Sequence, residues 1–198
     1  MKAAIFFIFM TILVTQLQAK TLLILGDSLT EGIGVAKDQA YPALLEKKIR
    51  TSGKNWKVIN AGISGATSAS GISRMKWHMK QKPDLVILAL GANDGLRGFA
   101  ISETEKNLST VIEMGQKEKI QMVLAGMLMP PNYGKEYSEK FKNLFPKLAK
   151  KYKVRLIPFL LDQVASDPSL NQADGIHPNE KGHQVVAETV YKNIQDLL

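Results

Sequence analysis

The stretch LLILGDSLTEG, residues 22–32, runs from four consecutive aliphatic residues straight into a glycine, an acid and a serine. A short apolar run that ends in this way is typical of a strand buried on both faces in a parallel sheet. Ligands bind such sheets outside the carboxyl ends of the strands, which is where Ser28 is expected to lie. Because a serine hydroxyl attacks a carbonyl only when a base takes its proton, the rest of the chain must supply that base.

Short apolar runs and longer segments of helical periodicity alternate along the chain. The strands are expected at residues 22–25, 57–59, 85–90, 122–125 and 156–157. The helices are expected near residues 41–51, 68–80, 102–118, 136–151 and 180–196. Pro42 suits the first turn of its helix, and Ser102 followed by Glu105 has the pattern of a capping box. Since each parallel return needs a right-handed crossover, the alternation predicts an α/β fold with helices on both faces of one parallel sheet.

The first residues have the features of a secretory signal peptide. Lys2 precedes an apolar run over residues 3–14, and a small residue, Ala19, follows it. The run is shorter than the roughly 20 residues that span a bilayer. We therefore expect a signal peptide over residues 1–19 and one exported domain over residues 20–198, periplasmic or secreted, with an uncleaved anchor as the alternative.

The composition excludes some chemistry and points to one charged surface. None of the 198 residues is a cysteine, so the chain has neither a disulfide nor a thiol nucleophile. The formal net charge is +8, and much of the excess lies between Lys135 and Arg155. Such a stretch can make transient contact with an anionic membrane surface, although it is more often a solvated helix face. No motif with interleaved aromatic residues predicts a nucleic-acid partner.

The base that Ser28 needs is expected among three histidines. His78 lies in a basic helical segment and His183 inside the last helix, where surface or packing roles are expected. His177 instead lies in a loop just before a proline, and Asp174 precedes it by three residues. In a turn, this spacing lets the carboxylate reach one imidazole nitrogen while the other faces outward, as a Ser-His-Asp triad requires. The alternative is that Asp174 only shapes the turn.

Acyl transfer also needs hydrogen-bond donors for the developing oxyanion, and three candidates follow successive strands. They are the backbone N–H of Ser28, the backbone N–H of Gly65 and the side-chain amide of Asn93. Glycine and asparagine are also common turn residues, so turn chemistry is the simpler explanation for each one alone. Their joint position after successive strands favours an oxyanion hole.

Together, four blocks of the sequence resemble the SGNH, or GDSL, hydrolase family. The blocks are GDSLTEG at 26–32, Gly65, GAND at 91–94 and DGIHP at 174–178. The strings TLLILGDSL, NDGLRGF, NYG, PKLAK and DGIHPN are similar to those of a bacterial periplasmic subgroup of thioesterases, lysophospholipases and arylesterases. The resemblance covers nearly the whole chain after residue 19. It implies a flavodoxin-like three-layer α/β/α sandwich with a five-stranded parallel sheet.

The resemblance also implies a role for each matched residue. Ser28 would be the nucleophile and the first oxyanion donor, with Gly65 and Asn93 as the other two donors. His177 would be the general base and Asp174 its partner. The implied chemistry needs no metal and no organic cofactor.

The expected reaction is hydrolysis of carboxylic esters or thioesters of short to medium or fatty acyl chains through an acyl-enzyme. The substrate would be a small acyl ester or a lysophospholipid, and a monomer is expected. The residues expected to contact the acyl chain lie in two loops: Gly95, Leu96, Phe99, Met127, Met129 and Pro130. For the methionines, completion of the core is the alternative. Ala66 stands where relatives often carry an acid, which puts the substrate preference in doubt.

Several other functions are alternatives to an esterase of this kind. A carbohydrate O-acetyl esterase is the alternative within the same chemistry, but both tryptophans, Trp56 and Trp77, are expected to be structural. A catalytically inactive acyl- or glycan-binding protein is the non-enzyme alternative, but every triad member is present. A phosphate-binding loop is disfavoured because Asp27 would repel the anion. Thr30 stands where the elbow of an α/β-hydrolase has glycine.

Overall fold

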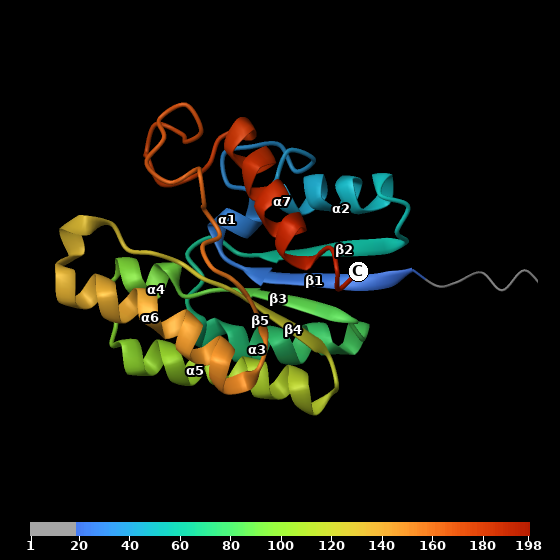
Figure 1. Cartoon of the computed structure of the whole chain (residues 1–198), viewed down its shortest axis with the longest axis horizontal. Coiled ribbons are helices and arrows are strands. Elements are labelled where there is room, and N and C mark those ends of the chain that lie inside the picture. Colours follow the sequence, from blue (N-terminus) through green and yellow to red (C-terminus); the bar gives the residue numbers. More distant parts are fainter. Residues whose placement is uncertain (1–18) are drawn as a thin grey trace, which may run out of the picture.

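The computed structural model describes residues 19–198, which form one parallel sheet between two layers of helices (Figure 1). The strands are β1 (Lys20–Gly26), β2 (Trp56–Gly62), β3 (Leu85–Ala89), β4 (Gln121–Ala125) and β5 (Arg155–Ile157). All pairs are parallel, in the order β2-β1-β3-β4-β5. The predicted five-stranded α/β sandwich is therefore confirmed. Of the predicted signal peptide at residues 1–19, all but Ala19 lies outside the described residues.

Helices cover both faces of the sheet, as Figure 1 shows. On one face lie α2 (Tyr41–Thr51) and α7 (Glu180–Ile194), and on the other α3 (Ser68–His78), α5 (Ile101–Lys117) and α6 (Lys135–Tyr152). Two short helices, α1 (Ser28–Glu31) and α4 (Ala92–Leu96), follow β1 and β3, and single 3-10 turns lie at Met79–Gln81 and Pro131–Tyr133. Within residues 19–198, no helix combines the length and the apolar character needed to cross a membrane.

The two central strands form the middle of the hydrophobic core. In β1, residues 22–25 have no exposed surface, and the same is true of residues 85–88 in β3. Removing such an aliphatic side chain from water contributes about 1.5–3 kcal/mol, so these eight residues strongly favour the central position of both strands. The apolar run that precedes Ser28 therefore places this serine at the carboxyl edge of the sheet.

The structure corrects the sequence-based prediction at the start of α5. The helix begins at Ile101 after Ala100, and no side chain caps it, so the predicted capping box is wrong. Ser102 lies inside the first turn, and Glu105 instead forms an ion pair with Lys147 of α6 at 2.8 Å. The first turn of α2 does contain Pro42, as predicted.

Candidate active site

Ser28 is the first residue of α1, directly after the turn that leaves β1. Asp27 caps this helix, since its carboxylate accepts the backbone N–H of Leu29 at 3.1 Å. The turn is tight because Thr30 packs against Gly26, where a Cβ would lie 1.9 Å from the threonine hydroxyl oxygen. A strand that ends on glycine and a capping acid thus holds Ser28 in one position at the edge of the sheet.

The structure brings together the three side chains of the predicted triad. Ser28 Oγ lies 2.9 Å from His177 Nε2, and His177 Nδ1 lies 2.6 Å from an oxygen of Asp174. The other oxygen of Asp174 accepts the backbone N–H groups of His177 and Ile176, both at 3.0 Å. These hydrogen bonds, led by the one from the His177 backbone, lower the pKa of Asp174 to about 2. Asp174 is thus a carboxylate at neutral pH and orients the imidazole toward the hydroxyl.

The loop that carries His177 is fastened to the start of the chain. Asn171 pairs with Pro178 in an isolated antiparallel bridge, and the backbone N–H of Gln172 donates to the carbonyl of His177 at 2.8 Å. The side-chain amide of Gln172 donates to the carbonyls of Pro178 and of Ile33, which follows α1. The loops that carry Ser28 and His177 are therefore held together by hydrogen bonds of their own.

The three candidate oxyanion donors lie in the wall of one cavity. Gly65 has φ +73, and within residues 19–198 its backbone N–H makes no hydrogen bond. Asn93 donates one amide hydrogen to the carbonyl of Ala66 at 3.0 Å, so its second hydrogen is available. Ser28 starts a helix, where the backbone N–H has no partner within the helix. All three groups thus have a hydrogen available for donation and line the same cavity.

Two charged side chains that the sequence analysis did not single out hold the loop of Gly65. The carboxylate of Glu31 accepts the backbone N–H of Ser64 at 2.6 Å and its hydroxyl at 2.5 Å. Arg97 donates to the carbonyl of Gly65 at 3.1 Å. The Ser64 hydroxyl is the main reason why the pKa of Glu31 lies below its usual value. Neither contact follows from a motif, because both join surface residues about 30 positions apart.

A third such side chain, Arg74 of α3, holds the ends of two strands. It donates to the carbonyl of Gly26 at 2.8 Å and to the carbonyl of Ala61. These carbonyls belong to β1 and β2, directly before the loops of Ser28 and Gly65. Arg74 therefore connects the segments that carry Ser28 and Gly65.

The remaining buried polar residues have structural partners. Asp94 accepts the backbone N–H of Ser68 at 2.8 Å and the hydroxyls of Ser68 and Thr104, which ties α4 to α3 and α5. His183 accepts the backbone N–H of Tyr41 at 3.2 Å, and burial lowers its pKa to about 4. The packing role expected for His183 is therefore confirmed. Burial raises the pKa of Asp27 to about 6.

A cavity of about 520 Å³ opens beside Ser28 and is lined mostly by apolar side chains. Four of the six residues predicted to contact an acyl chain line it: Leu96, Met127, Met129 and Pro130. The wall also includes Ile33, Phe159, Leu161 and Ile176, which the sequence analysis did not select.

The other two predicted contact residues, Gly95 and Phe99, do not line this cavity. Gly95 lies inside α4 beneath Met129, where a Cβ would lie 2.4 Å from the methionine sulfur. Phe99 is 45% exposed outside the cavity, and its carbonyl accepts the hydroxyl of Tyr137 at 3.0 Å. The turn of α4 therefore presents Leu96, rather than these two residues, to the cavity. Within residues 19–198, no three histidine, aspartate or glutamate side chains are grouped as ligands for a metal ion.

Comparisons with known proteins agree with this geometry. The sequence pattern of the GDSL-like Lipase/Acylhydrolase family matches residues 24–185. Esterase TesA of Pseudomonas aeruginosa is 37% identical over 190 residues, which cover 96% of this chain and 94% of the relative. Thioesterase 1/protease 1/lysophospholipase L1 of Escherichia coli is 39% identical over 194 residues, covering 97% and 92%. A crystal structure of TesA superposes with a TM-score of 0.88 at 38% identity, over 90% of this chain and all of that one.

The comparisons confirm the predicted family, the predicted fold and the predicted hydrolase class. The family pattern spans most of the chain, and both relatives are matched over more than nine-tenths of their length. The chain therefore belongs to the GDSL-like lipase/acylhydrolase family, in the group of esterases, thioesterases and lysophospholipases that these relatives represent.

Proposed function

We propose that the chain is a carboxylic ester hydrolase in which Ser28 is the nucleophile, His177 the general base and Asp174 its orienting partner. The observation that carries this proposal is the 2.9 Å contact between Ser28 Oγ and His177 Nε2. Asp174 occupies the other imidazole nitrogen at 2.6 Å, so Nε2 is left to accept the serine proton. The same two contacts meet the distance requirement for general-base catalysis.

The proposed reaction proceeds in two steps. Ser28 Oγ bonds to the ester carbonyl carbon as His177 takes its proton, and the resulting oxyanion accepts hydrogen bonds from Ser28 N, Gly65 N and Asn93 Nδ2. Collapse of this intermediate expels the alcohol or thiol, which leaves with the proton from His177. A water then gives its proton to His177 and attacks the acyl-enzyme, which releases the acid and restores Ser28. Asp174 stabilises the imidazolium in both steps.

The apolar cavity supports an acyl chain as the recognised part of the substrate. Its volume of about 520 Å³ is typical of small-molecule sites, and methionines such as Met127 and Met129 adapt to chains of different shape. The names of the relatives point to aryl esters, thioesters and lysophospholipids as candidate substrates. If residues 1–19 direct export, as we propose, lipids and other exported esters are the more accessible substrates.

A sugar ester is less compatible with this cavity. Trp56 is buried in the core, and Trp77 is 61% exposed on α3, away from the cavity. Phe159 is the one aromatic side chain other than His177 among the described lining residues. The cavity therefore offers little of the aromatic surface on which sugar rings stack.

A chain-length series of p-nitrophenyl esters, measured beside lysophosphatidylcholine and acetylated xylan, tests the proposal. We expect hydrolysis of short to medium acyl esters, lost by orders of magnitude in Ser28→Ala and in His177→Ala while the melting temperature is kept. Undiminished hydrolysis by Ser28→Ala would refute the assigned nucleophile. Turnover of acetylated xylan far above that of every acyl ester would refute the assigned substrate class.

A further inference from the structure

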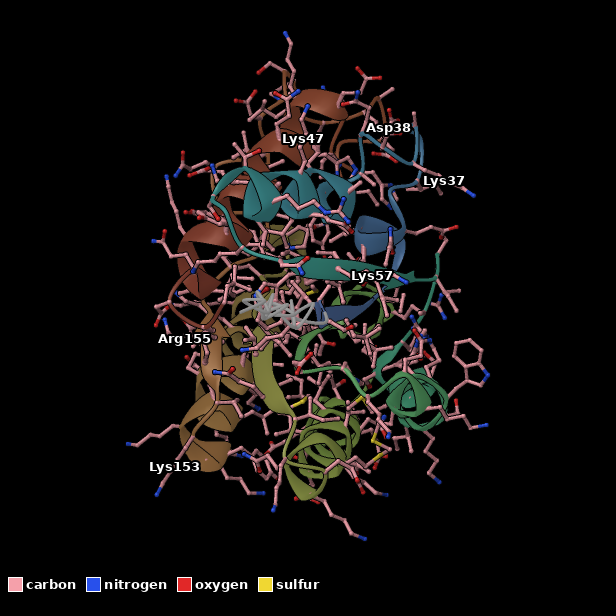
Figure 2. The ribbon with its side chains drawn as sticks, turned by 90° about the vertical axis from the view of Figure 1, so that its right-hand side faces the viewer. Lys37, Asp38, Lys47, Lys57, Lys153 and Arg155 are labelled. Carbon is pink, nitrogen blue, oxygen red and sulfur yellow. The ribbon has the colours of Figure 1, made fainter. Side chains whose placement is uncertain are left out.

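The edge of the sheet opposite the cavity carries a cluster of positive side chains. Because all strands are parallel, this edge collects the starts of strands and the ends of helices. We define the basic face by six exposed residues there: Lys20, Lys57, Lys82, Lys119, Lys153 and Arg155. Figure 2 looks onto this edge and shows Lys57, Lys153 and Arg155 around the starts of the strands.

Few acidic groups neutralise the basic face. Arg155 forms an ion pair with Asp196 at 2.5 Å. Asp84 accepts the backbone N–H of Thr21, and Glu118 is exposed beside Lys119. Among the ion pairs of residues 19–198, none includes any of the five lysines of the basic face. Six cations against these three acids leave the face with a net positive charge.

Three of these lysines adopt a backbone conformation that lysine disfavours. Lys82, Lys119 and Lys153 follow the helical segments before β3, β4 and β5, with φ values of +48, +58 and +53. A Cβ destabilises this left-handed conformation, and glycine is the usual residue at such helix ends. The turn before β2 does use glycine, Gly53, with φ +80.

Neither the backbone nor the helix dipole accounts for lysine at these three turns. Glycine would relieve the strain, and a lysine already lies in the last turn of α5, at Lys117, and of α6, at Lys151. Those lysines interact favourably with the helix ends without a left-handed backbone. Five described non-glycine residues have a positive φ, and the two outside this face, Gln163 and Ser166, are uncharged. The presence of lysine at all three turns of this face therefore favours a requirement for positive charge on this surface.

We propose that the basic face binds the surface of an anionic lipid bilayer and that the active-site cavity then points away from it. Charge complementarity supports this partner, since lysines close to an anionic bilayer each add to the binding energy. The sequence analysis allowed membrane contact anywhere along residues 135–155. The proposal places this contact at the carboxyl end of that stretch, because α6 runs toward the basic face and ends directly before Lys153.

Vesicle sedimentation tests whether the three strained lysines contribute to membrane binding rather than to the stability of their turns. Lys82→Gly/Lys119→Gly/Lys153→Gly, in a Ser28→Ala background to prevent hydrolysis, removes three charges and relieves three strained turns. The protein is the chain from Lys20 to Leu198, which contains every described helix and strand. We expect its affinity for phosphatidylglycerol vesicles to fall on the order of 10²-fold. Its melting temperature is expected to stay the same or rise, since glycine suits these turns.

The matched control removes three charges at the opposite end of the molecule. Lys106→Gln/Lys135→Gln/Lys181→Gln changes the net charge equally, and we expect it to bind the same vesicles within about threefold of the parent, because its lysines lie farther away than a Debye length. Equal losses in both triple variants, or binding to phosphatidylcholine vesicles as tight as to phosphatidylglycerol vesicles, would overturn the proposal. Retention on duplex DNA without retention on vesicles would also overturn it.

The orientation of the domain on the bilayer can be tested with fluorophores at single positions. Because the chain contains no cysteine, one introduced cysteine is the sole site of labelling. An environment-sensitive fluorophore on Glu118→Cys reports from the basic face, and one on Asp162→Cys reports from the cavity edge; both changes remove one exposed acid. Anionic vesicles should shift the emission of the first and leave the second unchanged. A shift at Asp162→Cys alone would reverse the orientation and overturn the proposal.

Discussion

Replacing Glu31 by alanine should slow the chemical step without weakening substrate binding. Glu31 accepts two hydrogen bonds from Ser64, whose neighbour Gly65 is the proposed oxyanion donor. Alanine removes both bonds, while Arg97 still holds the carbonyl of Gly65. The loop then samples positions in which the Gly65 N–H no longer points at the oxyanion.

The size of the effect follows from the two lost hydrogen bonds. A hydrogen bond to a charged group contributes about 1.5–3 kcal/mol when it is well shielded, but Glu31 is exposed, so solvent reduces this value. A combined loss of roughly 1.4 kcal/mol lowers the ratio of correctly placed to displaced loop about tenfold. We therefore expect kcat to fall by up to about tenfold, well short of the 10²–10³ that complete loss of an oxyanion donor costs.

Steady-state kinetics on a p-nitrophenyl ester, together with binding of a boronic acid that forms a tetrahedral adduct on Ser28, measure this effect. For Glu31→Ala we expect an unchanged KM, a lower kcat and a proportional loss of boronate affinity. Glu31→Gln keeps one acceptor oxygen, so its kcat should fall less than that of Glu31→Ala. The control Asp38→Ala removes another exposed acid and should leave KM, kcat and boronate affinity unchanged. An unchanged kcat in Glu31→Ala would refute the role of this carboxylate in positioning Gly65.

Three further substitutions test other parts of the site. Asn93→Ala should lower kcat on the order of 10²-fold with little change in KM, measured on the same esters, because it removes one proposed oxyanion donor; an unaltered kcat would exclude this role. For Asp27→Asn, thermal melts should show a gain in stability at pH 8, of up to about 3 kcal/mol, but little gain at pH 4. The pKa of Asp27 is raised to about 6, so its favourable contribution is present below about 3.8 and is lost as the pH rises through 6; equal stability at both pH values would contradict this. Met129→Ala enlarges the cavity and should shift the preferred acyl chain in the ester series toward greater length. An unchanged optimum of chain length would show that Met129 does not contact the acyl chain.

Long periodic segments of the sequence predicted most of the fold. The five strands and five long helices were predicted close to their observed bounds, because buried runs such as residues 22–25 have one stable location, inside the sheet. The short helices α1 and α4 were missed, since four or five residues are too few to show a helical period. The wrong capping box at Ser102 has a related cause, because tertiary packing starts α5 at Ile101 without any side-chain cap.

The candidate site was predictable where chemistry constrains spacing and unpredictable where packing decides. Asp174 and His177 are three positions apart in a local turn, so their contact could be predicted from this spacing. Whether Gly95 or Leu96 faces the cavity depends on the rotation of α4, which no sequence pattern fixes. The support of the Gly65 loop by Glu31 joins two surface residues of unrelated segments, and a single sequence carries no signal for such a pair.

The contact between Ser28 and His177 joins residues 149 positions apart, and this distance has a consequence for biosynthesis. The serine is synthesised early, but the imidazole that we propose as its general base is added only after all five strands have been made. Under the proposed mechanism, every nascent or truncated chain that stops before Asp174 holds an unreactive hydroxyl. Hydrolysis would then begin only after the loop of His177 has been synthesised, so the appearance of activity during translation would report completion of this loop rather than formation of the sheet.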